Sequence, residues 1–229
     1  MMAINNNLDA SIFGYSQIRR YAEFELTLTK CIDVYRTIST FQTQLCNNEN
    51  SIRDEFLKYL QCPDFKKKQE LRYLKFDLET IENTGRADIR ILPTKDEYID
   101  DKAYYIIECK RLDSKNLTGN AGLNAEYVKN GICRFVTDYY SSYFSCNAMF
   151  GFIVESVDVQ KDIVDNINSM LNINYINAQN REVNANVIQP MHYEDFANAY
   201  PYSYVSTHTC KSGKEITLYH LMFDFSQNI

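Results

Sequence analysis

The chain has 229 residues, of which 45% are hydrophobic, and a formal net charge of −6 at pH 7. This hydrophobic content excludes a disordered chain, and the length suits one domain. The acidic balance excludes a protein that coats nucleic acid by neutralising its phosphates, although an acidic protein can still hold a basic cleft.

No stretch of the sequence approaches the roughly 18 consecutive apolar residues of a membrane span, and its first residues lack the features of a secretory signal. We therefore expect a cytoplasmic protein that does not contact a membrane. The seven cysteines are scattered and include no CxxC pair, so they are predicted to be reduced thiols, mostly in the core.

Two amphipathic helices are predicted in the first third of the chain. Apolar residues recur at spacings of three and four over residues 17–45, as on a helix with one buried face. After a polar break, a second helix is predicted to run to about Leu60 and to end at Pro63, with Ser51 and Asp54 capping its start. The predicted inward positions are Ile18, Tyr21, Phe24, Leu28, Ile32, Tyr35, Ile38 and Phe41 in the first helix and Ile52, Phe56, Tyr59 and Leu60 in the second.

Three extended segments follow these helices. Residues 71–82 look extended, and residues 85–92 alternate apolar and polar side chains, which is the periodicity of a strand. A polar connection of ten residues then leads to a second strand at 103–110. The last two strands are therefore predicted to form a hairpin.

The rest of the chain alternates helices and strands. The sequence predicts a helix at 124–144, with Val128, Ile132, Phe135, Val136, Tyr139 and Tyr143 inward, a buried strand at 149–155, a helix at 158–171, a strand at 185–191, and a terminal hairpin of 203–210 and 215–225. This order describes one domain, 1–229, of the α/β or α+β class, with a mixed central sheet flanked by helices.

Charged residues near the ends of the predicted hairpin strands are the strongest indication of chemistry. Asp88 lies on the polar side of the first strand, and the second strand ends in Glu108, Cys109 and Lys110. Side chains two positions apart in a strand point the same way, so Glu108 and Lys110 are predicted to share one site. Charges inside so apolar a strand are usually paired or bound to metal.

The segments GRADI and IIECKR, which contain these residues, resemble the core motif of the PD-(D/E)xK nuclease superfamily, which includes restriction endonucleases. The resemblance covers about residues 45–155, with the helix at 17–45 and an extension at 172–229 outside it. It implies a restriction-endonuclease-like sheet and a site that binds Mg²⁺, with Mn²⁺ as a substitute. Ala87 stands where the family motif has proline.

Carried onto this chain, the resemblance makes Asp88 and Glu108 metal ligands, assisted by the backbone carbonyl of Cys109. Lys110 would position or deprotonate the attacking water. A glutamate on the preceding helix often joins such sites, and Glu49 is the candidate because Ile52 and Phe56 place it on the inward side, with Glu55 as its rival.

The residues expected to contact nucleic acid are all basic. On the helix at 124–144, Tyr127, Gly131, Arg134 and Asp138 form a stripe opposite the apolar face, and Arg134 is the candidate for the scissile phosphate. Arg111 and the run Lys66, Lys67 and Lys68 are the other candidates. His208 and His220 are predicted to be structural, because no third zinc ligand has suitable spacing.

The sequence therefore predicts a magnesium-dependent endonuclease that hydrolyses phosphodiester bonds in DNA. A loose likeness of the motif region and tail to bacterial defence nucleases adds the expectation of a restriction or anti-phage effector that acts with an ATPase or sensor protein. The long first helix could supply a homodimer interface. The alternatives are a nuclease that acts on RNA and a non-catalytic binding or assembly subunit that keeps the fold.

Overall fold

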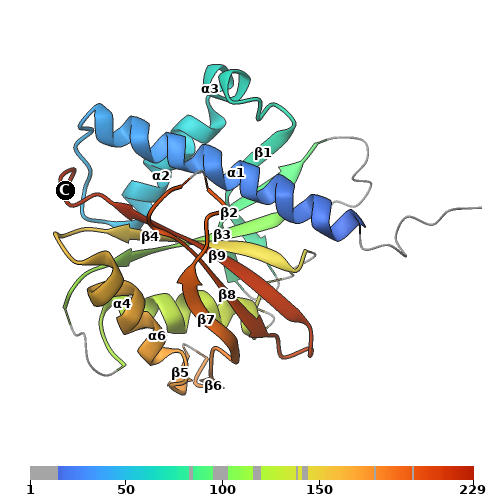
Figure 1. Cartoon of the computed structure of the whole chain (residues 1–229), viewed down its shortest axis with the longest axis vertical. Coiled ribbons are helices and arrows are strands. Elements are labelled where there is room, and N and C mark those ends of the chain that lie inside the picture. The colour runs from blue at the N-terminus through green and yellow to red at the C-terminus, as the bar shows by residue number, and fades with distance from the viewer. Residues whose placement is uncertain are drawn as a thin grey trace, which may run out of the picture.

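A seven-stranded mixed sheet runs through the centre of the computed structural model (Figure 1). The structure describes residues 15–82, 85–94, 103–115, 120–137, 139–140, 144–177, 179–197 and 199–229. The predicted class, a mixed central sheet flanked by helices, is confirmed. In spatial order the strands are β1 (Leu74–Glu82), β2 (Gly85–Pro93), β3 (Tyr105–Leu112), β4 (Cys146–Ile153), β9 (Glu215–Asp224), β8 (Ser203–Thr209) and β7 (Val187–Tyr193).

The strand directions change from one half of the sheet to the other. Strands β1, β2 and β3 form an antiparallel meander, β4 is parallel to β3, and β9 is parallel to β4. Strands β8 and β7 then continue antiparallel. The predicted hairpin of β2 and β3 and the predicted terminal hairpin of β8 and β9 are therefore both confirmed.

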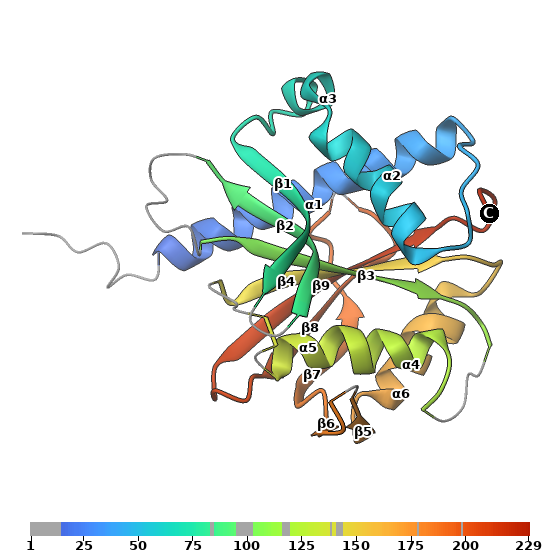
Figure 2. The ribbon, with the colours of Figure 1, turned by 180° about the vertical axis from the view of Figure 1, so that it is seen from behind.

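Helices cover both faces of the sheet (Figure 2). One face carries α1 (Tyr15–Thr40) and α2 (Glu49–Gln61), with the short α3 (Pro63–Lys68) beyond the end of α2. The other face carries a segment of α4 (Leu123–Tyr127), the π-helix η2 (Val128–Ile132) and α5 (Cys133–Val136), and then the π-helix η3 (Val159–Asp165) and α6 (Asn166–Met170). A two-stranded hairpin of β5 (Tyr175–Ile176) and β6 (Glu182–Val183), which the sequence did not predict, lies beside this second layer.

The first two helices differ from the prediction at their ends. Helix α1 ends at Thr40 instead of Leu45, and the predicted core residues Ile18 and Phe41 are 70% and 71% exposed. Ile18 lies in the first turn, which extends past the sheet (Figure 1), and Phe41 follows the last turn. The predicted cap of α2 is also wrong, because Asn48 is the N-cap and accepts a hydrogen bond from the backbone amide of Ser51 at 3.2 Å.

The helix predicted at 124–144 is confirmed at its start but ends at Val136, and its predicted inward residues Val128, Ile132, Phe135 and Val136 are buried. It reaches Val136 through the π-helical turn η2, and Tyr127 and Gly131, predicted on an outward stripe, are buried. The Tyr127 hydroxyl contacts His220 of β9, and Gly131 lies against Met149 of β4, so this part of the helix is buried on more than one side. Asp138 and Tyr143, also assigned to this helix, lie outside the described residues.

The segment 172–229 contributes three strands to the same sheet. Strand β9 lies between β4 and β8, with Leu221 and Phe223 in the core under α1 and Leu218 and Met222 in the core under α4. Among the described helices, none is long and apolar enough to cross a membrane.

Candidate active site

The site begins where β2 and β3 separate. The two strands pair from Ile91 opposite Tyr105 to Ile89 opposite Ile107. Further along β3, the amides of Cys109 and Arg111 donate to side chains instead of to β2. The Cys109 amide donates to Asp88 Oδ2 at 2.8 Å, and the Arg111 amide donates to Glu49 Oε2 at 3.1 Å. Two carboxylates thus replace the sheet hydrogen bonds that β3 lacks, which fixes both carboxylates beside its edge.

The ammonium of Lys110 lies at the centre of the site. Its Nζ is 2.7 Å from Glu108 Oε1, 2.7 Å from the carbonyl oxygen of Cys109, 3.2 Å from Glu49 Oε1 and 3.8 Å from Asp88 Oδ2. The structure therefore brings together the four side chains that the sequence proposed. Glu55, the rival of Glu49, instead pairs with Lys58 on α2.

Glu108 is fully buried and accepts hydrogen bonds from three sides. Besides Lys110, the guanidinium of Arg134 donates to Oε1 at 2.5 Å, and the hydroxyl of Tyr140 donates to Oε2. Burial raises the pKa of Glu108 to about 7, although the charges of Lys110 and Arg134 lower it. For Lys110, burial lowers the pKa, but Glu108, Asp88 and Glu49 outweigh burial and hold this pKa above its usual value.

Arg53 is a site residue that the sequence analysis missed. Its side chain is 3% exposed, and its guanidinium donates to Asp88 Oδ1 at 3.1 Å and to Glu79 Oε1 at 3.2 Å. Arg53 follows Glu49 by four positions on α2, so the two share a helical face. That spacing is the signal in the sequence that could have identified it.

Glu79 and Tyr140 were also missed. Glu79 has a φ of +44°, at the point where the register of β1 and β2 skips the pair of Glu79 and Asp88. A left-handed residue other than glycine costs roughly 1 kcal/mol or more, and such strain often lies at functional sites. The Glu79 carboxylate is held there by Arg53 and by Arg86 at 2.7 Å.

These groups line an open cleft of about 330 Å³. Four cations and three carboxylates face it, and Glu108 lies buried beneath. The charges nearly balance, which distinguishes the cleft from an acidic protein surface. Its lining residues are Glu49, Asn50, Arg53, Glu79, Gly85, Arg86, Asp88, Lys110, Arg134 and Tyr139.

The oxygens around Lys110 are of the kind that Mg²⁺ prefers. Asp88, Glu108 and the Cys109 carbonyl are hard ligands, and in this structure they surround the ammonium cation of Lys110. Within the described part of the chain, no three histidine, cysteine, aspartate or glutamate side chains form a metal-binding group. These oxygens are donors of the type that binds a hard divalent cation, and the Lys110 ammonium that they surround in this structure would have to move aside for such a cation to bind.

The other predicted nucleic-acid contacts are only partly brought to this cleft. Arg134 lines it, with its guanidinium 5.2 Å from the ring centre of Tyr139. The Arg111 guanidinium instead binds the backbone and side-chain oxygens of Asn47 at 2.9 and 2.8 Å. The lysines at 66–68 lie on α3, past the C-terminal end of α2, whereas Glu49 lies at its N-terminal end (Figure 2).

His208 and His220 belong to a buried chain of hydrogen bonds, as expected for structural residues. The hydroxyl of Ser206 is 2.7 Å from Nε2 of both rings, and Nδ1 of His220 is 2.8 Å from the Tyr127 hydroxyl. Nδ1 of His208 is 2.8 Å from the carbonyl of Ala185. Burial lowers the pKa of His208 to about 4 and also lowers that of His220, so both rings are neutral at pH 7.

No family model, curated protein or solved structure matches this chain. The likeness to PD-(D/E)xK nucleases therefore depends on the residues of the motif, above all Asp88, Glu108 and Lys110. The geometry around Lys110 is the basis on which a function can be argued.

Proposed function

We propose that this protein is a metal-dependent nuclease of the PD-(D/E)xK type that hydrolyses phosphodiester bonds in DNA. The observation that carries the proposal is the set of oxygens from Glu49, Asp88, Glu108 and the Cys109 carbonyl, all within 4 Å of Lys110 Nζ. Acidic metal ligands beside a buried ammonium, in a cleft with further cations, are the groups that phosphodiester hydrolysis requires.

Each residue has a role that follows from its position. Asp88, Glu108 and the Cys109 carbonyl would hold Mg²⁺, which supplies Lewis acidity to the phosphate and to the attacking water. Lys110 stabilises the charge that develops on the phosphate oxygens and holds the water in line. Glu49 orients Lys110 through its 3.2 Å contact, and Arg134, at the rim, binds a phosphate oxygen.

A non-catalytic binding or assembly module is the second candidate, and one observation favours it. Each of the carboxylates Glu49, Asp88 and Glu108 already pairs with a cation of the chain. Such a network could be a purely structural solution to burying charge at the end of a hairpin. The two candidates differ in whether a divalent cation binds.

Cleavage of plasmid DNA, with an RNA of equal length in parallel, tests the nuclease. We expect the wild type to cut in Mg²⁺ or Mn²⁺ and to stop in EDTA, and Lys110→Ala to lose about 100-fold or more in rate. Lys115→Ala is the matched control, because this exposed lysine pairs with Glu155 away from the cleft, and it should cut within two-fold of the wild type. Equal cutting by all three proteins would mean that the activity comes from a contaminant.

Metal binding separates the two candidates without any need for an activating partner. A cation that binds the native state alone must raise the melting temperature. We expect Mg²⁺ or Mn²⁺ to stabilise the wild type but not Asp88→Asn, which keeps an acceptor for the Cys109 amide. If neither metal stabilises the wild type and neither nucleic acid is cut, the nuclease proposal is wrong and the binding module is favoured.

A further inference from the structure

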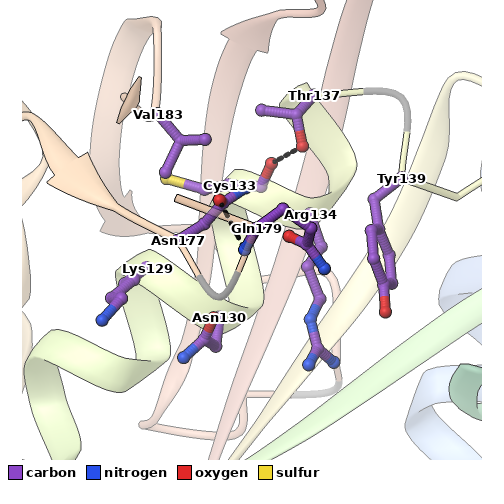
Figure 3. A pocket seen from close by; sticks show the side chains of 9 residues that line it. All are labelled: Lys129, Asn130, Cys133, Arg134, Thr137, Tyr139, Asn177, Gln179 and Val183. Carbon is purple, nitrogen blue, oxygen red and sulfur yellow. Dashed lines mark hydrogen bonds between the residues drawn. The ribbon is translucent and has the colours of Figure 1, made fainter. Parts of the chain in front are cut away.

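The active-site cleft continues into two further hollows beside α5 and the β5–β6 hairpin. Arg134 and Tyr139 line the cleft and also a pocket of about 80 Å³ (Figure 3). Thr137, Asn177, Gln179, Val183 and again Tyr139 are shared by that pocket and a larger one of about 520 Å³. Because neighbouring hollows share walls, the three form one track. We call the two hollows beyond the cleft the hairpin groove.

The charge of the hairpin groove is opposite to that of the whole protein. Of the described residues that line it, Lys129, Arg134, Arg181 and Lys211 are cationic and Glu182 alone is acidic. The chain as a whole carries −6. Amide side chains supply most of the remaining polar surface. A basic, amide-rich track on an acidic protein is the pattern of a local nucleic-acid contact.

Backbone hydrogen bonds hold the walls of the groove in place. The amide of Lys211 donates to the carbonyl of Val136 at 2.7 Å, which ties the β8–β9 turn to the end of α5. The side chain of Asn177 accepts from the amides of Gln179 and Arg181 at 3.0 and 2.9 Å, which shapes the β5–β6 turn. Arg181 and Lys211 therefore project from anchored turns, and Lys129 and Arg134 from the helical segment η2 and α5, so little backbone ordering is needed when a ligand binds.

Tyr139 lies at the junction between the cleft and the groove. Arg134 lies over its ring, and both side chains extend in the same direction in Figure 3. A Cβ atom on Gly85 would come within 1.7 Å of the Tyr139 hydroxyl, so glycine lets this ring reach β2. An aromatic ring beside a guanidinium is a platform on which a base can stack.

From these features we infer that the hairpin groove binds a single polynucleotide strand that leaves the active-site cleft past Tyr139. This inference rests on the proposed function and extends it. The groove cations bind phosphates, and Tyr139 stacks a base. A base that stacks on Tyr139 must be unpaired, which favours a single strand over a duplex.

Binding of fluorescein-labelled 20-nucleotide dT and U strands, and of a duplex of equal length, tests the groove by anisotropy in EDTA. The variant is Arg181→Glu with Lys211→Glu, both exposed residues. Arg36→Glu with Lys58→Glu, on α1 and α2, is the matched control, because it reverses two exposed charges on residues that line neither the cleft nor the groove. We expect at least ten-fold weaker strand binding in the groove variant and less than two-fold change in the control.

The salt dependence gives a second readout. Loss of two phosphate contacts should reduce the slope of log K against log salt by about 1.4, because each contact contributes roughly 0.7 for single strands. Tighter binding of dT or of U would identify the preferred sugar. Thermal unfolding of each variant checks that it remains folded.

The inference fails if the groove variant binds within two-fold of the wild type, or if both double variants weaken binding equally. Preference of the wild type for the duplex, lost in the groove variant, would overturn the assignment to a single strand. Because these measurements need neither metal nor cleavage, failure of the groove and failure of the nuclease proposal give different results. Cleavage in Mg²⁺ by a protein whose groove variant binds normally would overturn the groove alone.

Discussion

Arg53 is the buried cation that sets the charge of the candidate site. Its guanidinium donates to Asp88, Glu79 and Asp54, of which Asp54 is exposed. Without this cation, Asp88 would face Glu108 and Glu49 with Lys110 as the nearest positive charge. Arg53 therefore permits three carboxylates to stay close together at the end of β3.

We predict that Arg53→Met destabilises the fold by about 3 kcal/mol, because it removes the buried cation that contacts both carboxylates and leaves Asp88 with Lys110 at 3.8 Å and Glu79 with the exposed Arg86. The matched control is Arg36→Met, since the Arg36 side chain is 55% exposed and pairs with Asp33 at 3.5 Å. That exposed pair should be worth less than about 1 kcal/mol. Urea unfolding of both variants measures the difference, and equal losses would contradict the role of Arg53.

Glu108 gives the fold a pH dependence of defined sign. Its pKa rises from 4.5 to about 7 because of burial, so between these values the folded protein keeps a proton that the unfolded chain has released. The contribution of this proton to the free energy of unfolding is therefore fully present below pH 4.5 and is lost as the pH rises through 7. His208, whose pKa falls from 6.5 to about 4, acts in the opposite direction, with stability lost as the pH falls.

Glu108→Gln removes the first effect and leaves the second. In metal-free buffer, we expect the free energy of unfolding of the wild type to rise by about 2 kcal/mol relative to that of the variant when the pH is lowered from 8 to 5. Each pKa unit corresponds to roughly 1.4 kcal/mol. Thermal or urea unfolding at the two pH values measures the difference. A stability difference that does not change with pH would mean that burial leaves the pKa of Glu108 unaltered.

At the scale of elements, the separation of β2 and β3 is what creates the site. Most of the elements were predictable because period-two and helical patterns are strong in this sequence, and Glu108 and Lys110 followed from strand alternation. The approach of Asp88 to β3 followed from the predicted hairpin, whereas the place of Glu49 beside β3 was suggested by the resemblance. Propensity does not reveal that two amides of β3 take carboxylates as partners.

The misses have physical causes of their own. The helix at 123–136 is buried on more than one side, so Tyr127 and Gly131 were wrongly assigned to an outward stripe although the residues predicted inward are also buried. Arg53 was missed because a lone arginine beside an acidic residue is usually on the solvent-exposed surface. Its burial depends on Glu79 and Asp88, which lie far from it in the sequence.

The N-cap of α2 controls where Glu49 stands. Asn48 accepts a hydrogen bond from Ser51, and we predict that Asn48→Ala costs about 1 kcal/mol of stability through loss of this cap. Asn50→Ala is the matched control, because the same change two positions later lies within the helix, where alanine is favourable. Chemical denaturation should separate the two variants, and equal stability would show that the cap contributes nothing.

At the scale of the whole molecule, the C-terminal region is part of the core and cannot be treated as an addition to residues 45–155. Strand β9 pairs with β4 from Cys146 opposite Thr217 to Ile153 opposite Asp224. Its side chains enter both cores. The motif region therefore depends on strands that lie about a hundred residues further along the chain.

We predict that a chain ending at residue 171 does not fold, because β4 would lose its neighbour on one side and both cores would lose apolar side chains of β8 and β9. Near-ultraviolet circular dichroism and proton NMR dispersion measure this. A chain ending at residue 226, after β9, is the control and should keep its tertiary structure. Native dispersion in the shorter chain would contradict the prediction.

The carboxylate-capped edge of β3 also links the site to amide hydrogen exchange. The Cys109 and Arg111 amides are held by the side chains of Asp88 and Glu49, whereas neighbouring sheet amides are held by other strands. If those two carboxylates move away, the two backbone amides lose their acceptors and exchange their hydrogens with the solvent while the sheet stays intact. Deuterium uptake confined to the amides of residues 109 and 111 would therefore detect movement of Asp88 and Glu49 away from β3, even when the rest of the sheet does not change.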